Sequence, residues 1–128
     1  EDDPIAVRAR ALIAAYAVGM AEAARDMAVD YAKERQQFGK PIGSFQAVKH
    51  PLVDAMIGID LARSLVYDAA CAYDEAPERA LVAARMAKSK ASDVGRFVST
   101  PDYMPVDADY RGGGNSQSGP RESWVQSP

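Results

Sequence analysis

Apolar residues recur every three or four positions over three long stretches of the chain, which is the spacing of one helical face. In the first stretch they are Ile13, Tyr16, Met20, Ala23, Met27 and Tyr31. We expect a helix over residues 4 to about 36, with Asp2 or Asp3 as its cap and Pro4 at its first position. At 1.5 Å per residue it would be roughly 46 Å long, a length typical of bundles. Gly19 lies inside it and is expected to mark a close crossing with another helix.

The other two stretches predict helices over residues 44 to about 73 and 77 to about 99, and together the three make an all-α, up-and-down bundle. Their apolar faces are Leu52, Met56, Ile59, Val66, Ala69 and Tyr73 in the second helix and Leu81, Ala84, Ala87, Ala91, Val94 and Val98 in the third. The Ser44 hydroxyl is placed where the second helix can start. Pro51 conflicts with the helix interior, so we expect a kink or a tightened first turn there, or regular helix only from about His50.

The composition changes after the third helix. Proline, glycine and serine become frequent, and the only tryptophan, Trp124, has no periodic apolar neighbours. We therefore divide the chain into a helical bundle, residues 1–99, and an irregular or disordered tail, residues 100–128. The three glycines at 112–114 lack the Lys-Ser/Thr and the preceding strand of a phosphate loop.

Charge and composition reduce the number of possible functions. The 128 residues carry a net charge of −3, which argues against nucleic acid, and no apolar run reaches the ~20 residues of a membrane span. The single cysteine, Cys71, and the absence of a signal-peptide pattern favour a reducing, cytoplasmic location. The only histidine, His50, leaves no metal cluster and no nucleophile triad, and a helix-surface role is expected for it. The start without Met is typical of a fragment or a processed product.

Residues 31–48 join the first two helices and carry the most suggestive chemistry. Arg35 and Lys40 are cations beside Phe38, and Gly39, Pro41 and Gly43 follow the end of the first helix. Cations, an aromatic face and free backbone N–H groups can hold a flat, phosphate-bearing ligand. The same residues are also ordinary for a helix end, where cations complement the dipole and Gly and Pro form the loop.

The order of these residues adds information. Tyr-x-x-x-Arg-x-x-Phe-Gly-Lys-Pro-Ile followed by Phe-Gln-Ala-Val resembles the signature of the C-terminal helical domain of the acyl-CoA dehydrogenases. The likeness runs from about Pro4 to about Ser99. It implies part of a four-helix bundle that builds a tetramer, in an enzyme that oxidises acyl-CoA thioesters with FAD and a glutamate base.

The resemblance also implies roles for four residues. Arg35 matches the arginine that pairs with the FAD pyrophosphate, Gln46 the glutamine that hydrogen-bonds FAD, and Phe38 the aromatic that packs by it. In the family this FAD is shared between dimer partners. Arg10 matches an arginine near the catalytic glutamate and acyl-CoA, so it is expected to bind substrate.

Departures from the family are equally informative. The glycine-rich turn, the fourth helix and the Glu-Gly-Thr segment that carries the usual base are missing, and Ala9 stands at the other known base position. No catalytic residue is therefore expected. We predict the C-terminal part of an FAD-dependent acyl-CoA dehydrogenase that contributes to FAD binding and oligomerisation and is inactive alone.

Two alternatives stay open. One is a non-enzymatic helical interaction module, and the other is a non-catalytic subunit that lends Arg35 and Gln46 to a partner dehydrogenase. The expected partners are accordingly another copy of the chain or a dehydrogenase subunit, with acyl-CoA bound only in the complete enzyme. A shifted reading frame across residues 102–109 would give a sequence near the family's glycine turn, so a frameshift near Ser99 is a further hypothesis. Sequencing a gene that has no adjoining family segments in any frame would contradict it.

Overall fold

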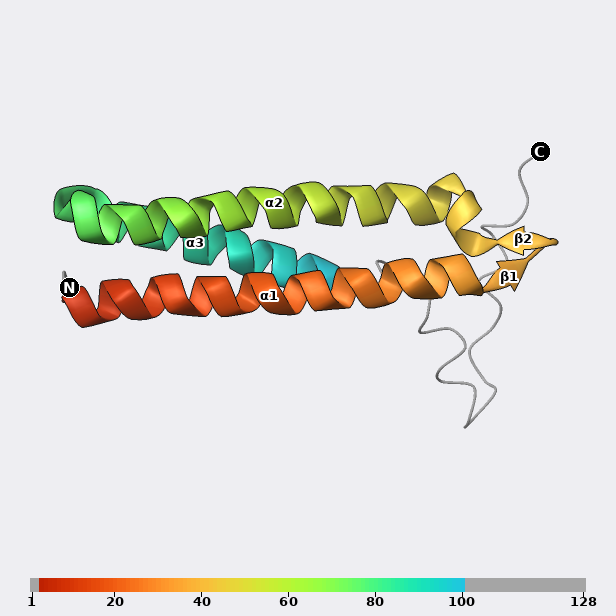
Figure 1. Cartoon of the computed structure of the whole chain (residues 1–128), viewed down its shortest axis with the longest axis horizontal. Coiled ribbons are helices and arrows are strands. Elements are labelled where there is room, and N and C mark those ends of the chain that lie inside the picture. The colour runs from red at the N-terminus through yellow and green to blue at the C-terminus, as the bar shows by residue number, and fades with distance from the viewer. Residues whose placement is uncertain (1–2, 101–128) are drawn as a thin grey trace, which may run out of the picture.

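The computed structural model describes residues 3–100, which form three helices, each antiparallel to the next along the chain. Helix α1 spans Pro4–Glu34, α2 spans Gln46–Glu75 and α3 spans Pro77–Val98. Between α1 and α2 lie two short strands, β1 at Gln36–Gln37 and β2 at Lys40–Pro41, and a 3-10 turn, η1, at Ile42–Ser44. Helices α1 and α2 run side by side, and α3 packs against both (Figure 1). The predicted all-α, up-and-down bundle is confirmed.

Helix α1 begins as the sequence predicts. The Asp3 carboxylate accepts a hydrogen bond from the Ile5 N–H at 3.0 Å, and Pro4 occupies the first turn, where its missing N–H costs nothing. The helix ends at Glu34, and the Arg35 N–H donates to the Tyr31 carbonyl at 2.9 Å. The expected cap at Asp2 lies outside the described residues.

The face of α1 that packs in the bundle is not the predicted one. Its buried residues are Val7, Ala14, Val18, Ala21, Ala28 and Ala32. Ile13, Tyr16, Met20 and Met27 of the predicted stripe are between 56% and 72% exposed. The helix is apolar on two sides, and the small residues face the other helices because they let the helix axes approach closely.

Helix α2 begins at Gln46 and continues through Pro51. Regular helix therefore starts before His50, contrary to one alternative drawn from the sequence. Ser44 does not cap the helix, because the capping position is Phe45 and the Ser44 hydroxyl donates to the Pro41 carbonyl at 2.7 Å. The buried face includes Ile59 and Ala69, as predicted, while Met56 is 44% exposed.

Helix α3 and its predicted face are confirmed. Ala84, Ala87, Ala91, Val94 and Val98 are buried and Leu81 packs against them. The link from α2 is the single residue Ala76, since the residue before a proline avoids the helical region.

Alanine makes up most of the core, and Ile59 is the largest fully buried side chain in the described part of the chain. The close helix crossing lies at Gly58, where an added Cβ would sit 3.2 Å from a methyl of Val94. The expectation for Gly19 is wrong, because nothing within residues 3–100 lies within 4 Å of the space a Cβ would occupy there. Because most of the core residues are alanine, the helices approach closely but each residue buries little apolar area.

Ion pairs at the surface connect the helices. Arg63 of α2 contacts Glu22 of α1 and Asp60 of its own helix, and Arg79 of α3 contacts Asp68 of α2. These side chains are partly exposed, so each pair contributes no more than about 1 kcal/mol.

Helix α1 is also long and apolar enough, by length and composition, to cross a membrane. The core helix of a bundle can meet the same criteria, so the expected absence of a membrane span stays a prediction.

The predictions for the C-terminal tail fall on residues that the structure does not describe. These are Trp124, the glycines at 112–114 and the shifted-frame segment at 102–109. The division into residues 1–99 and 100–128 also stays a prediction.

Candidate functional site

The junction between α1 and α2 is a two-stranded hairpin rather than the irregular loop that the sequence indicated. Gln36 pairs with Pro41, and Gln37 pairs with Lys40. The turn residues are Phe38, with φ 52°, and Gly39, with φ 75°. A two-residue turn of this kind needs positive φ at both positions, which glycine adopts freely and phenylalanine does not. Holding Phe38 there costs about 1–2 kcal/mol.

The strained turn presents an aromatic side chain. Phe38 is 75% exposed, and its ring meets the ring of Phe45 edge-to-face, with centroids 6.2 Å apart and an interplanar angle of 78°. The Lys40 ammonium lies 4.5 Å from the centroid of Phe45. Phe45 thus connects the turn to the start of α2. Sequence reasoning did not single out Phe45, although it stands directly before Gln46.

The base of the hairpin is held against the end of α1. The Ile42 N–H donates to the Arg35 carbonyl at 2.8 Å, and the Ile42 side chain is buried. A Cβ at Gly43 would lie 2.9 Å from the Ala32 carbonyl oxygen, so only glycine fits there without a shift. These contacts fix where Arg35 leaves α1 and where Gln46 begins α2, and both residues are exposed.

The structure therefore gathers three predicted site residues, Arg35, Phe38 and Gln46, at one end of the bundle (Figure 1). Helix α3 starts at the opposite end and is shorter by nine residues than α1, 22 against 31. Of the described helices, only α1 and α2 extend over roughly the last 13 Å towards the hairpin. Within residues 3–100, α3 therefore does not cover the hairpin end of the bundle.

Arg10 is not part of this group. It lies on α1, 25 residues before Arg35, which directly follows the end of that helix, so the two are separated by roughly 38 Å along the helix axis. Arg10 is half-buried, and its buried Nη1 has no hydrogen-bond partner among residues 3–100. A buried guanidinium nitrogen without an acceptor is costly, so an oxygen from a ligand or another chain segment would stabilise it.

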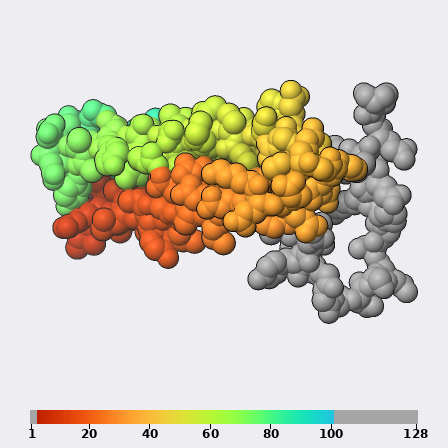
Figure 2. Space-filling model, turned by 45° about the vertical axis from the view of Figure 1, so that its right-hand side comes forward, coloured from red at the N-terminus to blue at the C-terminus, as the bar shows by residue number. Residues whose placement is uncertain are grey.

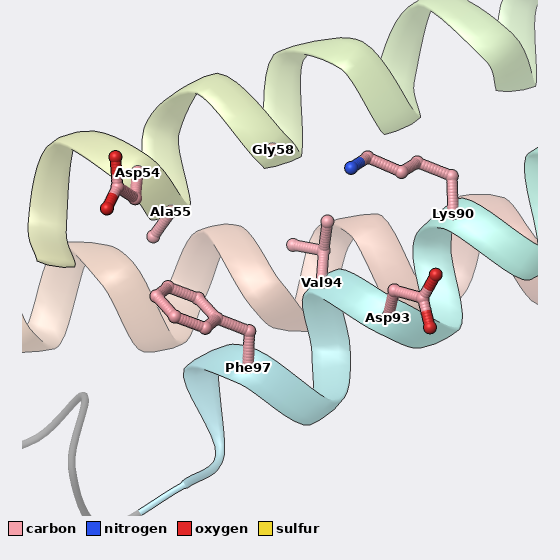
Figure 3. A pocket seen from close by; sticks show the side chains of 7 residues that line it. All are labelled: Asp54, Ala55, Gly58, Lys90, Asp93, Val94 and Phe97. Atoms are coloured by element: carbon pink, nitrogen blue, oxygen red, sulfur yellow. The ribbon is translucent and has the colours of Figure 1, made fainter.

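A shallow groove of about 260 Å³ lies between α2 and α3. Figure 3 shows Phe97 and Asp54 at one end, Lys90 at the other and Val94 between them. The groove holds none of the predicted site residues. Its walls offer charge and apolar surface for contact, but no histidine, cysteine or other strong nucleophile.

The remaining candidates for chemistry lie apart. His50 and Cys71 are both exposed on α2, so the helix-surface position expected for His50 is found. Within residues 3–100, no three histidine, cysteine or acidic side chains are placed to hold a metal ion.

The amino-acid sequence is similar to those of known proteins. Residues 6–100 match the family description "Acyl-CoA dehydrogenase, C-terminal domain". The chain belongs to the acyl-CoA dehydrogenase family. The match takes in all of α2, the hairpin and α3, and all but the first two residues of α1, so the recognition from the junction motif is confirmed.

Individual relatives support the assignment. The short-chain-specific acyl-CoA dehydrogenase of Megasphaera elsdenii is 48% identical over 88 residues, which are 69% of this chain and 23% of that protein. The acyl-CoA dehydrogenase IpdE2 of Mycobacterium tuberculosis is 47% identical over 90 residues, 70% of this chain and 27% of that protein. The 3-sulfinopropanoyl-CoA desulfinase of Cupriavidus necator is 37% identical over 110 residues, which are 86% of this chain and 26% of that protein.

A solved structure is similar as well. It is described as "Electron transferring flavoprotein of Acidaminococcus fermentans: Towards a mechanism of flavin-based electron bifurcation", and one chain of it aligns with a TM-score of 0.61 and 39% identity. The alignment covers 77% of this chain and 30% of that one. This acyl-CoA dehydrogenase family chain thus spans about a quarter of the length of the curated relatives it matches.

Proposed function

We propose that the chain is the C-terminal part of an FAD-dependent acyl-CoA dehydrogenase and supplies one half of a flavin site at its hairpin end. The observation that carries this proposal is Phe38. A large aromatic residue is held at positive φ and is 75% exposed, at a position where glycine would be unstrained. Backbone strain of this kind is kept at ligand sites because the side chain is needed there.

The groups around Phe38 suit the chemistry of FAD. Arg35 carries a permanent positive charge for a pyrophosphate, and Gln46 offers an amide that both donates and accepts hydrogen bonds. Phe38 and Phe45 present apolar ring surface next to them. When bound, FAD would accept the hydride removed from the acyl chain, and the residues here would bind and orient it.

The distance between Arg10 and Arg35 fits a flavin shared by two subunits. One FAD molecule cannot meet both residues if they lie about 38 Å apart. In a shared arrangement, Arg35, Phe38 and Gln46 would serve the partner's flavin, while Arg10 would lie near the acyl-CoA of its own subunit. The unpartnered Nη1 of Arg10 would then find its acceptor in the complete enzyme.

We further propose that this chain alone does not dehydrogenate acyl-CoA. The proton at the α-carbon must go to a base, and Ala9 stands where some family members place that base. The segment that carries the base in most relatives has no counterpart in this sequence. Acyl-CoA would therefore be bound and oxidised only in a complete enzyme.

The test is a visible absorption spectrum of the purified chain, recorded after incubation with FAD and desalting. We expect the purified chain to retain a flavin absorption band. The substitution Arg35→Met should lower the affinity for FAD at least tenfold, because the positive charge that would face the pyrophosphate is lost. Arg85→Met is the matched control, since Arg85 is an exposed arginine on α3. Equal loss in both variants would contradict the half-site, and so would the absence of retained flavin both with and without a complete dehydrogenase.

The exposed apolar residues favour a second candidate, a helical interaction module without an enzymatic role. Fifteen large hydrophobic side chains in the described part of the chain are at least 40% exposed, far more than isolated surface residues require. Mixing the chain with a complete dehydrogenase distinguishes the candidates. Flavin retained only with that partner indicates a non-catalytic subunit, and binding without any flavin effect indicates the module. The cytoplasmic location also stays a proposal.

A further inference from the structure

The register of the hairpin puts the side chains of Arg35 and Lys40 on one face. Gln37 pairs with Lys40, and two residues further from the turn the Ile42 N–H donates to the Arg35 carbonyl at 2.8 Å. Side chains two residues apart on a strand point to the same side, and diagonal neighbours across two strands are about 7–8 Å apart. The hairpin therefore presents two cations on the same face.

Lys40 is available to bind an anion. The segment from Arg35 to Phe45 contains no aspartate or glutamate. Within residues 3–100 Lys40 forms no ion pair, whereas Lys33, near the end of α1, contacts Asp30 at 3.6 Å. The Lys40 ammonium instead lies 4.5 Å from the centroid of the Phe45 ring. An ammonium group has three N–H donors, and the ring covers only one side of it.

Phe45 stands where a capping residue would be expected. It occupies the N-cap position of α2, and its side chain makes no capping hydrogen bond. Serine, threonine, aspartate and asparagine are preferred at this position because their side chains accept a hydrogen bond from the first turn. The contribution of Phe45 is its ring, which contacts Phe38 edge-to-face and Lys40 through a cation–π interaction. A residue that departs from the local preference in this way is typical of a functional site.

We propose that Lys40 supplies the second positive charge for the diphosphate of FAD, and that Phe45 is the positioning residue that holds Lys40 for this role. This inference rests on the proposed flavin half-site and adds two residues to it. FAD carries two adjacent phosphates, and Arg35 provides a charge for only one of them. Lysine has a long, flexible stem, so Lys40 can reach the phosphate next to the one bound by Arg35.

The position of the hairpin suits a large dinucleotide. Strands β1 and β2 extend beyond the ends of α1 and α2 (Figure 1). Figure 2 shows this end, coloured orange to yellow, at the surface and turned towards the viewer. Coenzyme A also contains a diphosphate, but Arg10, the residue expected to lie near acyl-CoA, is roughly 38 Å away along α1. The geometry therefore favours FAD over coenzyme A.

The test is the binding of FAD and FMN to the full chain, measured by equilibrium dialysis. FMN carries one phosphate and thus serves as the ligand control. We expect Lys40→Met to raise the dissociation constant for FAD at least about fivefold and that for FMN less than about twofold, because Arg35 alone can pair with a single phosphate. Lys88→Met is the matched control variant, since Lys88 is an exposed lysine on α3. If FAD is retained only with a complete dehydrogenase, the same variants are compared in that mixture.

The positioning role of Phe45 has its own test. Phe45→Leu keeps an apolar side chain but removes the ring, and it should raise the dissociation constant for FAD about two- to fivefold with little change for FMN. Phe45→Tyr keeps a ring that can bind a cation and should restore the affinity. In a Lys40→Met background, Phe45→Leu should have less than about a twofold effect, because Phe45 acts through Lys40. Thermal melts establish that each variant is folded.

The outcomes separate this inference from the half-site itself. If Arg35→Met weakens FAD binding and Lys40→Met does not, the second cation is refuted and the half-site stands. Equal weakening of FAD and FMN by Lys40→Met or Phe45→Leu would show a merely structural role. If Lys40→Met weakens the binding of coenzyme A and not of FAD, the wrong diphosphate has been assigned. A chain that binds no FAD with or without a complete dehydrogenase refutes both proposals.

Discussion

Replacing Ile59 with alanine tests the packing of the bundle most directly. Ile59 is fully buried and is the largest such side chain in the described residues. The substitution removes three carbons, worth about 2.4 kcal/mol at about 0.8 kcal/mol for each buried methylene. The cavity adds to this cost because the surrounding core is mostly alanine, which has no side-chain rotamers that can move into the space. The higher helix propensity of alanine returns about 0.4 kcal/mol.

We therefore expect Ile59→Ala to lower the free energy of unfolding by about 3–4 kcal/mol. Urea denaturation followed by far-ultraviolet circular dichroism measures this change, with all variants at one protein concentration. The control is Ile57→Ala, two residues away on the same helix and 58% exposed, for which a change within about 0.5 kcal/mol is expected. A loss below about 1.5 kcal/mol for Ile59→Ala, or equal losses for both variants, would refute the proposed packing of α2.

The other predictions concern backbone positions. Gly43→Ala should lower the free energy of unfolding by about 1–3 kcal/mol, because its Cβ would meet the Ala32 carbonyl oxygen at 2.9 Å. An unchanged midpoint in a thermal melt would contradict this. Gly19→Ala, measured where the chain is monomeric, should raise stability by up to about 1 kcal/mol, since the site is helical and open, and a loss would show an unrecognised contact. Asp3→Ala should cost about 1 kcal/mol by removing the cap of α1, whereas Asp3→Asn, which keeps the acceptor, should cost less; equal costs would assign the effect to charge rather than to capping.

The sequence predicted the three helices because their apolar periods are long and their ends carry clear signals, such as Asp3-Pro4 and Ala76-Pro77. It did not predict which side of α1 faces the bundle. Both Ile13 and Ala14 belong to an apolar stripe, and periodicity alone does not rank two stripes. The structure places Ala14 inside because the bundle has close helix contacts, which large side chains would prevent.

The glycines show the same limit. The sequence does not distinguish the three glycines at positions 19, 43 and 58. In the structure only Gly43 and Gly58 lie close enough to other atoms to exclude or crowd a Cβ. That distinction depends on which segments become neighbours in space. The hairpin was missed because Phe38 occupies a turn position that usually signals itself as Asn or Gly. The motif at the junction identified the family and its residues but not the geometry that presents them.

The single-residue link at Ala76 has a consequence for the order of folding. Helices α2 and α3 are joined by one residue, whereas α1 is separated from α2 by Arg35 to Phe45. Closing the shorter connection costs less chain entropy, so the α2–α3 pair is expected to be formed in the transition state, with α1 docking afterwards. Alanine-to-glycine substitutions at buried positions such as Ala69 and Ala84 should then slow folding. The same change at Ala14 should mainly speed unfolding.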